Sequence, residues 1–247
     1  MDDLVYVAMT GAKQTELAQS VNSHNLANAS TTGFRADLHA FSALPIEGFG
    51  EPTRVNAVAE NYGTDFTRGA TMSTGRDLDV AVKGDGFIAV QAPDGGEAYT
   101  RAGDLRVNSV GVMTNGAGHP VIGNGGPVAV PPHASITVGA DGTISIQPLG
   151  QGPETLATVD RIKLVRPDHE QLEKGADGLI RLKDDSVAPA DAGVRLTSGA
   201  LESSNVNVAE TLVNMIDLAR RYELQVKMMS TASEDADTAA QLLGMSG

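Results

Sequence analysis

Apolar and small side chains recur at a strict four-three spacing through the C-terminal part of the chain. This spacing places one side chain per turn on the same helical face, and when sustained it is typical of a coiled-coil seam. The predicted helix begins after Asn205 or Asn207, either of which can cap it. The row consists of Val208, Leu212, Met215, Ala219, Tyr222, Val226, Met229, Ser233, Ala236, Ala240 and Leu243.

A second and weaker row of small side chains runs through the N-terminal segment. A helix is predicted from Asp2 or Asp3 to Asn28, because the acidic pair complements the helix dipole and a run of poor helix formers leads to Gly33. The small residues require close partners, and we expect the C-terminal row to pair first with this helix and then with neighbouring copies. The N-terminal row consists of Leu4, Ala8, Gly11, Thr15, Ala18 and Asn22.

The middle of the chain alternates between short β-type runs and tight turns. Four Asp-Gly and two Asn-Gly dipeptides mark hairpin turns between residues 80 and 180. This spacing indicates a sandwich or barrel-like all-β domain, whereas residues 34–77 indicate an extended, loop-rich connector. The predicted strands occupy 78–82, 87–90, 105–107, 128–130, 136–138, 143–146, 161–165 and 179–182.

These elements predict an α+β fold, in which a mainly-β domain is inserted between two terminal helices that pair as a coiled coil. The expected parts are a terminal-helix domain (1–33 plus 206–247), an extended connector (34–77 plus 192–205) and a β-rich outer domain (78–191).

Composition excludes several classes of function. The net charge of −13, from 31 acidic and 18 basic residues, argues against binding to nucleic acid. The absence of cysteine excludes disulfides, thiolate zinc sites and a cysteine nucleophile. No stretch approaches the roughly 20 apolar residues that span a bilayer, and the N-terminus is acidic where a signal peptide would be basic. We therefore expect a soluble chain with no membrane insertion and no cleaved signal.

No catalytic or metal-binding pattern stands out. The five histidines have no metal-ligand spacing, and no nucleophile elbow or phosphate-binding loop is present. We expect no enzymatic activity, no metal and no cofactor. Two alternatives remain: a β-domain adhesin or glycan-binding module, and a glycan hydrolase. A hydrolase would need two carboxylates facing a cleft, for which Asp79, Asp85 and Glu97 are candidates only by default.

Four blocks of the sequence resemble signatures of bacterial flagellar rod and hook proteins, in the order of that family. Both chain ends and most of the middle share the resemblance. The blocks are Asn25–Phe34 (NLANASTTGF), Leu78–Phe87 (LDVAVKGDGF), Tyr99–Asp104 (YTRAGD) with Gly118–Gly123 (GHPVIG), and Gly199–Asn207 (GALESSNVN).

The resemblance implies a structural subunit of the flagellar basal-body rod. The chain length and both termini look most like the proximal rod branch, with a distal rod or hook-type axial protein as the alternative. Such proteins polymerise helically through their terminal helices and form the driveshaft and export channel between the membrane ring and the hook. The implied partners are further copies, other proximal and distal rod proteins, and the type III export apparatus, which needs no cleaved signal. The implied location is the rod crossing the periplasm.

The two helical rows and the family blocks together define a candidate assembly interface. It consists of Leu4, Ala8, Gly11, Thr15, Ala18, Asn25, Leu26, Asn28, Gly33, Phe34, Leu201, Asn205, Val208, Leu212, Met215, Ala219, Tyr222, Val226 and Met229.

Overall fold

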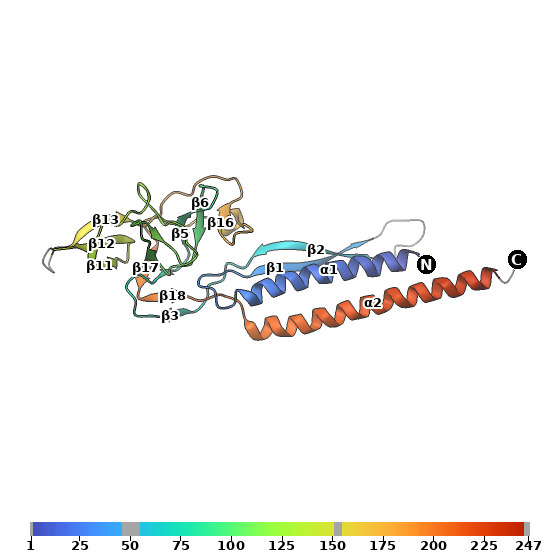
Figure 1. The fold of residues 1–247 in the computed structure, drawn as a ribbon. Coiled ribbons are helices and arrows are strands. Elements are labelled where there is room, and N and C mark those ends of the chain that lie inside the picture. Colours follow the sequence, from blue (N-terminus) through green and yellow to red (C-terminus); the bar gives the residue numbers. More distant parts are fainter. Residues whose placement is uncertain (1, 46–54, 151–154, 245–247) are drawn as a thin grey trace. The chain divides into compact units, whose positions relative to one another are not determined.

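The chain folds into two compact units. The computed structural model describes residues 2–45, 55–150 and 155–244 (Figure 1). The helical unit contains residues 1–29, 37–65 and 206–247, and the β unit contains residues 30–36 and 66–205.

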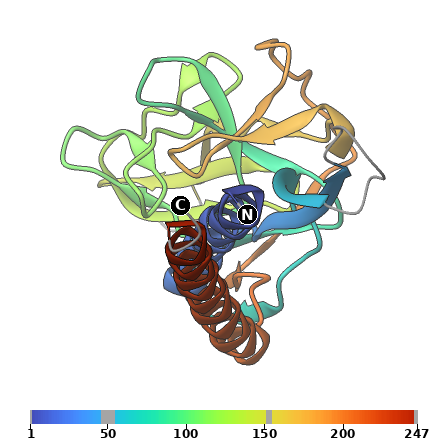
Figure 2. The same ribbon diagram turned by 90° about the vertical axis from the view of Figure 1, so that its right-hand side faces the viewer.

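The helical unit consists of two long helices and a β-hairpin. Helix α1 (Asp2–Ala27) and helix α2 (Val208–Gly244) lie side by side and antiparallel, so that the chain ends lie at the same end of the pair (Figures 1 and 2). This arrangement confirms the predicted pairing of terminal helices. Strands β1 (Asp37–Pro45) and β2 (Val55–Thr64) form the hairpin, which also contacts α1.

The β1–β2 hairpin was not predicted. The sequence indicated extended and loop-rich chain over 34–77, and the described part of that segment is extended but strand-paired, with Asp37 opposite Thr64. The register shifts between Leu38 and His39, which interrupts the period-two alternation by which a strand is found in a sequence. The part of the predicted connector at 46–54 lies outside the described residues.

The β unit is built from short strands. In chain order these are β3 (Thr71–Ser73), β4 (Val80–Lys83), β5 (Phe87–Gln91), β6 (Glu97–Thr100), β7 (Arg106–Val107), β8 (Met113–Thr114), β9 (Ile122–Gly123), β10 (Gly126–Pro127), β11 (His133–Val138), β12 (Thr143–Pro148), β13 (Ala157–Arg161), β14 (Leu164–Val165), β15 (Leu172–Lys174), β16 (Ile180–Leu182), β17 (Arg195–Ser198) and β18 (Ala200–Glu202), with the 3-10 turn η1 (His169–Gln171) before β15.

These strands form several small antiparallel sheets. The largest has five strands in the order β14-β5-β6-β16-β15, and β11-β12-β13 form a second. The remaining strands pair as β17-β4, β18-β3, β7-β8 and β10-β9. A sandwich or barrel was predicted, but many strands of two or three residues are too short to extend into two broad sheets. Of the predicted runs, 128–130 forms only a bridge at Ala129, and 161–165 is divided between β13 and β14.

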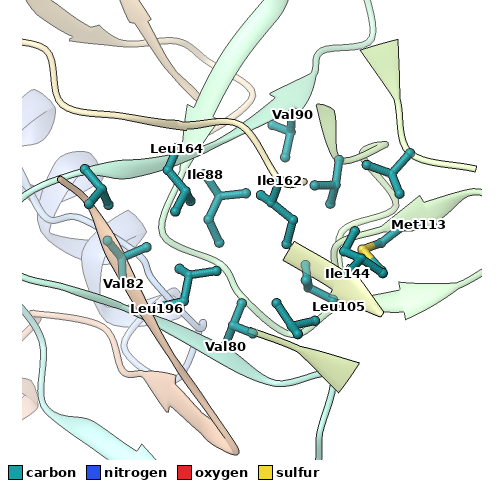
Figure 3. Close-up of a cluster of buried hydrophobic side chains, with 14 of the residues drawn as sticks. Val80, Val82, Ile88, Val90, Leu105, Met113, Ile144, Ile162, Leu164 and Leu196 are labelled. Carbon is teal, nitrogen blue, oxygen red and sulfur yellow. The ribbon is translucent and has the colours of Figure 1, made fainter. Parts of the chain in front are cut away.

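Strand β5 lies between two hydrophobic clusters. Ile88 and Val90 belong to the larger cluster (Figure 3), whereas Phe87 and Ala89 belong to the smaller. Successive side chains of a strand point to opposite faces, so one strand supplies both clusters. The larger cluster extends as far as Leu196 on β17, so the returning chain closes the same core (Figure 3).

Candidate assembly site

One face of α1 is buried although it carries almost no large apolar side chains. Its members recur every three or four residues and are small or polar, which allows another helix to approach closely. The members of the predicted row from Ala8 onward are buried, while the side chain of Leu4 lies outside the described residues. The buried positions are Ala8, Gly11, Ala12, Thr15, Ala18, Asn22 and Asn25.

Polar contacts join α1 to α2 within this face. Asn22 Nδ2 donates to the Thr211 carbonyl at 2.8 Å. The Thr15 hydroxyl lies 3.1 Å from Gln225 Oε1. A β-carbon at Gly11 would lie 2.9 Å from Gln225 Nε2, so the helices meet at van der Waals distance here.

The row of α2 that is buried differs from the predicted row by one position. Thr211, Leu218 and Ala232 are buried, whereas Val208 and Leu212 of the predicted row are 46% and 45% exposed. The two rows share Met215 and Met229, which are half-buried. A search for apolar spacing misses the buried row because two of its members are polar and are held by hydrogen bonds to Asn22 and Thr15.

As a result, the helical unit leaves apolar side chains uncovered on both helices. On α2 they include Val208, Leu212, Ile216 and Val226, which form a strip beside the α1-facing row. The predicted Tyr222 is 41% exposed, and Ala219 is half-buried. On α1 the exposed apolar residues are Tyr6, Met9 and Leu17. A continuous apolar strip on a helix is typical of a surface that binds a partner.

The end of α1 is tied to the start of the hairpin. Asn25 Nδ2 donates to the Asp37 carbonyl and Asn25 Oδ1 accepts from the Asp37 N–H, both at 2.9 Å. His24 Nδ1 lies 2.9 Å from Asp37 Oδ2. Asn28 Nδ2 donates back to the His24 carbonyl at 3.0 Å, and Leu26 is half-buried. These side chains therefore satisfy backbone groups where the helix stops.

Gly33 and Phe34 lie in the β unit, where the N-terminal segment meets the rest of that unit. Gly33 has a φ of +67°, and a β-carbon there would lie 2.3 Å from the carbonyl carbon of Arg101. The Phe34 ring is buried, with Lys174 Nζ 3.9 Å from its centroid. Leu201 is half-buried in β18 opposite Met72. Only glycine fits the first of these positions.

Asn205 and Asn207, which the sequence offered as alternative caps, have different roles. Asn207 Oδ1 accepts from the N–H of Ala209 at 3.1 Å, so Asn207 is the N-cap of α2. Asn205 instead accepts the Ala36 N–H at 2.8 Å and donates to the Thr67 carbonyl at 3.1 Å.

Three charged side chains form a buried cluster in the β unit, which we call the ionic junction: Arg35, Arg101 and Glu202. Arg35 Nη2 lies 2.5 Å from Glu202 Oε1, and Arg101 Nη1 lies 2.8 Å from Glu202 Oε2. Their side chains are 1–3% exposed. The Gly69 N–H donates to Glu202 at 3.0 Å, and Arg101 Nη2 donates to the Gly84 carbonyl at 2.7 Å.

The charges of the ionic junction perturb one another. Burial acts to raise the pKa of Glu202, but the positive charges of Arg101 and Arg35 outweigh it, so this pKa lies below its ordinary value of 4.5. Burial lowers the pKa of Arg101. The sequence analysis missed this cluster because its members are up to 167 positions apart. The sequence does contain one sign of the cluster, because each of its members lies in or beside a different family block: Arg35, Arg101 and Glu202.

The carboxylates considered for a glycan hydrolase lie in surroundings that differ from one another. Glu97 is paired with Lys163 at 2.8 Å, and Asp79 is buried with Arg76 Nη1 3.2 Å away. Asp85 is exposed in the turn before β5. Across residues 2–45, 55–150 and 155–244, no three His, Asp or Glu side chains gather as a metal site would require. Nor does any helix in the described part of the chain have the length and apolarity to cross a membrane.

The β unit carries one further feature of a different kind. A surface hollow of about 510 Å³ lies between the segment after β14 and the segment before β17, near the Arg166–Asp191 ion pair. Its walls include Val187, which is exposed, and Pro189.

Comparison with known proteins decides the family. Three family models match: "Flagella basal body rod protein" at residues 5–35, "Flagellar hook protein FlgE/F/G D1 domain" at 81–146 and "Flagellar basal body rod FlgEFG protein C-terminal" at 197–242. The flagellar basal-body rod protein FlgF of Escherichia coli K12 is 46% identical over the whole of both chains, and that of Salmonella typhimurium is 45% identical. The chain belongs to the flagellar basal-body rod protein family. The resemblance found in the sequence is confirmed, and the chain is a FlgF-like rod protein.

Other rod-family relatives match less closely. The flagellar basal-body rod protein FlgG of Bacillus subtilis is 30% identical over 93% of this chain and 95% of its own length. The three matching models also divide the ionic junction among them, because Arg35, Arg101 and Glu202 each fall in a different one. The junction therefore joins one residue from each of the three matched regions of this chain.

Proposed function

We propose that this chain is a structural subunit of the flagellar basal-body rod, of the FlgF type that forms its proximal part. The observation that carries the proposal is full-length identity of 46% and 45% to two proteins named flagellar basal-body rod protein FlgF. The 30% identity to a FlgG protein supports the distal rod alternative less well.

The subunit polymerises through its helical unit. The α2 strip that begins at Val208 and Leu212 is uncovered in the single chain. It borders the α1–α2 contact at Met215, Tyr222 and Met229. These side chains are already about half buried, so each one that a neighbour covers contributes about 1 kcal/mol, and a few such contacts repeated around a helical array hold it together. Of the residues named from the sequence, those left exposed form the interface between copies: Val208, Leu212, Tyr222 and Val226, with Ile216 added from the structure. Ala8, Thr15 and Ala18 are buried within the single chain.

The remaining parts of the function follow from this role. The chain acts by packing, without catalysis, cofactor or metal. Its partners are copies of itself, other proximal and distal rod proteins, and the type III apparatus, which exports it without a cleaved signal. It works in the rod where that structure crosses the periplasm and encloses the export channel.

Electron microscopy of basal bodies tests the proposal. A strain that lacks the gene is complemented with either the full chain or residues 34–247. We expect rods to stop short of the distal segment in the deletion strain, and hooks to return only with the full chain. Complete rods and hooks without the gene would refute the rod assignment, and ligand binding by residues 78–191 would then support a glycan-binding module.

A further inference from the structure

The two segments that lead to the helices are paired inside the β unit. The Gly33 N–H donates to the Glu202 carbonyl at 2.8 Å, and the Asn205 N–H donates to the Phe34 carbonyl at 3.4 Å. The Ala36 N–H donates to Asn205 Oδ1 at 2.8 Å. The segment that follows α1 and the segment that precedes α2 therefore lie side by side within the β unit, independently of any contact between the helices.

The ionic junction fastens this pairing. Arg35 comes from the first segment, Glu202 from the second, and Arg101 from the body of the β unit. The cluster has two positive charges and one negative charge, and Nε of both arginines has no hydrogen-bond partner. Buried ion clusters of this kind seldom improve on apolar packing in stability, so their contribution is to fix one arrangement.

When the ionic junction is formed, less free chain separates the end of α1 from the start of α2. We call this free chain the tether. Helix α1 ends at Ala27 and α2 begins at Val208. With the junction closed, the free chain is residues 28–32 and 203–207, about 10 residues. With residues 30–36 released and the β1–β2 hairpin intact, it grows to residues 28–36, 65–70 and 203–207, about 20. Loop-closure entropy scales as three-halves of the logarithm of length, so the effective concentration of one helix at the other falls about three-fold.

We propose that Arg35 and Glu202 are positioning residues for helix pairing: by closing the ionic junction they hold the helix-forming termini on a short tether. The role belongs to the single chain and is independent of which rod segment the protein builds. It also gives a role to the buried charges, which are not required for the stability of the core.

The absence of native cysteine allows a direct test. Gly11→Cys and Gln225→Cys introduce a pair on facing helices, since a β-carbon at Gly11 lies 3.8 Å from Gln225 Cγ. The rate of disulfide formation with oxidised glutathione, in the dilute full-length monomer, reports how often the helices meet. We expect Arg35→Met to slow it about three-fold, because this change leaves Arg101 and Glu202 as a balanced pair. Arg35→Lys keeps the charge and should restore most of the rate.

Two controls separate positioning from folding. Arg106→Met makes the same substitution at an arginine whose side chain is 62% exposed, and should leave the rate unchanged. Hydrogen exchange at Val80–Val90 reports whether the β unit stays folded. An unchanged rate in Arg35→Met with the β unit protected overturns the proposal.

A second variant covers the case in which Arg35→Met unfolds the β unit. Asn205→Ala removes the bond to the Ala36 N–H without disturbing a buried charge. It should slow disulfide formation by up to about three-fold while protection at Val80–Val90 persists. A rate equal to that of the parent cysteine pair would overturn the proposal.

Discussion

Single residues determine whether the N-terminal segment fits against the rest of the β unit, and Gly33 shows this most directly. Replacement by alanine adds both the strain of a positive φ and a collision with the backbone at Arg101. Gly75 is a matched control, because its φ is +71° and nothing lies within 4 Å of its β-carbon position. We expect Gly75→Ala to lower the free energy of unfolding by about 1–2 kcal/mol and Gly33→Ala by at least about 2 kcal/mol more. Urea unfolding measures both; equal losses would show that the close approach is absent.

A second residue-scale prediction concerns acid. A carboxyl group whose folded-state pKa lies below its ordinary value stabilises the fold above that value, and this contribution is lost as pH falls through the folded-state pKa. For Glu202 the loss therefore begins near pH 4.5 and continues below it. At pH 7 we expect Glu202→Gln to cost about 3–5 kcal/mol. Urea midpoints of the variant and the parent chain should converge as pH falls from 4.5; a constant difference would contradict this assignment.

At the scale of elements, the two faces of α2 should have different functions. Leu212 lies in the uncovered strip and Leu224 lies on another face of the same helix, 45% and 66% exposed respectively. Both leucines are exposed, so Leu212→Asp and Leu224→Asp should each change monomer stability by less than about 1 kcal/mol. In complemented cells, we expect Leu212→Asp to abolish hooks and swimming and Leu224→Asp to preserve them. Equal loss in both would remove the distinction between the faces.

The helices themselves should be marginal outside the assembly. The buried face of α1 is made of Ala, Gly, Thr and Asn, which bury little apolar area, and isolated helices depend on such burial. In a dilute monomer we expect narrow amide dispersion for residues 2–27 and for α2, beside well-dispersed signals from β5. Folded-helix shifts at residues 2–27 would contradict this expectation.

The sequence predicted well that both helices exist and how far they extend. It predicted less well which face of α2 packs on α1 and which charged side chains pair. Spacing alone locates α1 and α2 because their rows are long. It misplaces the α1-facing row of α2 by one position because Thr211 and Gln225 contribute through hydrogen bonds. The register shift beside Leu38 hides the hairpin, and no local pattern connects Arg35 with Glu202.

For the whole molecule, the arrangement of β5 determines how the β unit comes apart. Its alternate side chains supply both hydrophobic clusters, so neither cluster can open while the other keeps this strand in place. We expect Ile88→Ala and Phe87→Ala, one in each cluster, to shift a single unfolding transition by about 2–5 kcal/mol. Calorimetry and hydrogen exchange should agree on that transition, whereas two separable transitions would contradict the shared strand.

A unit that opens only as a whole has no half-open intermediate to offer a protease or a self-associating neighbour. The shared strand therefore makes the proteolytic susceptibility of the β unit all-or-none: the unit is cleaved only when it is fully unfolded.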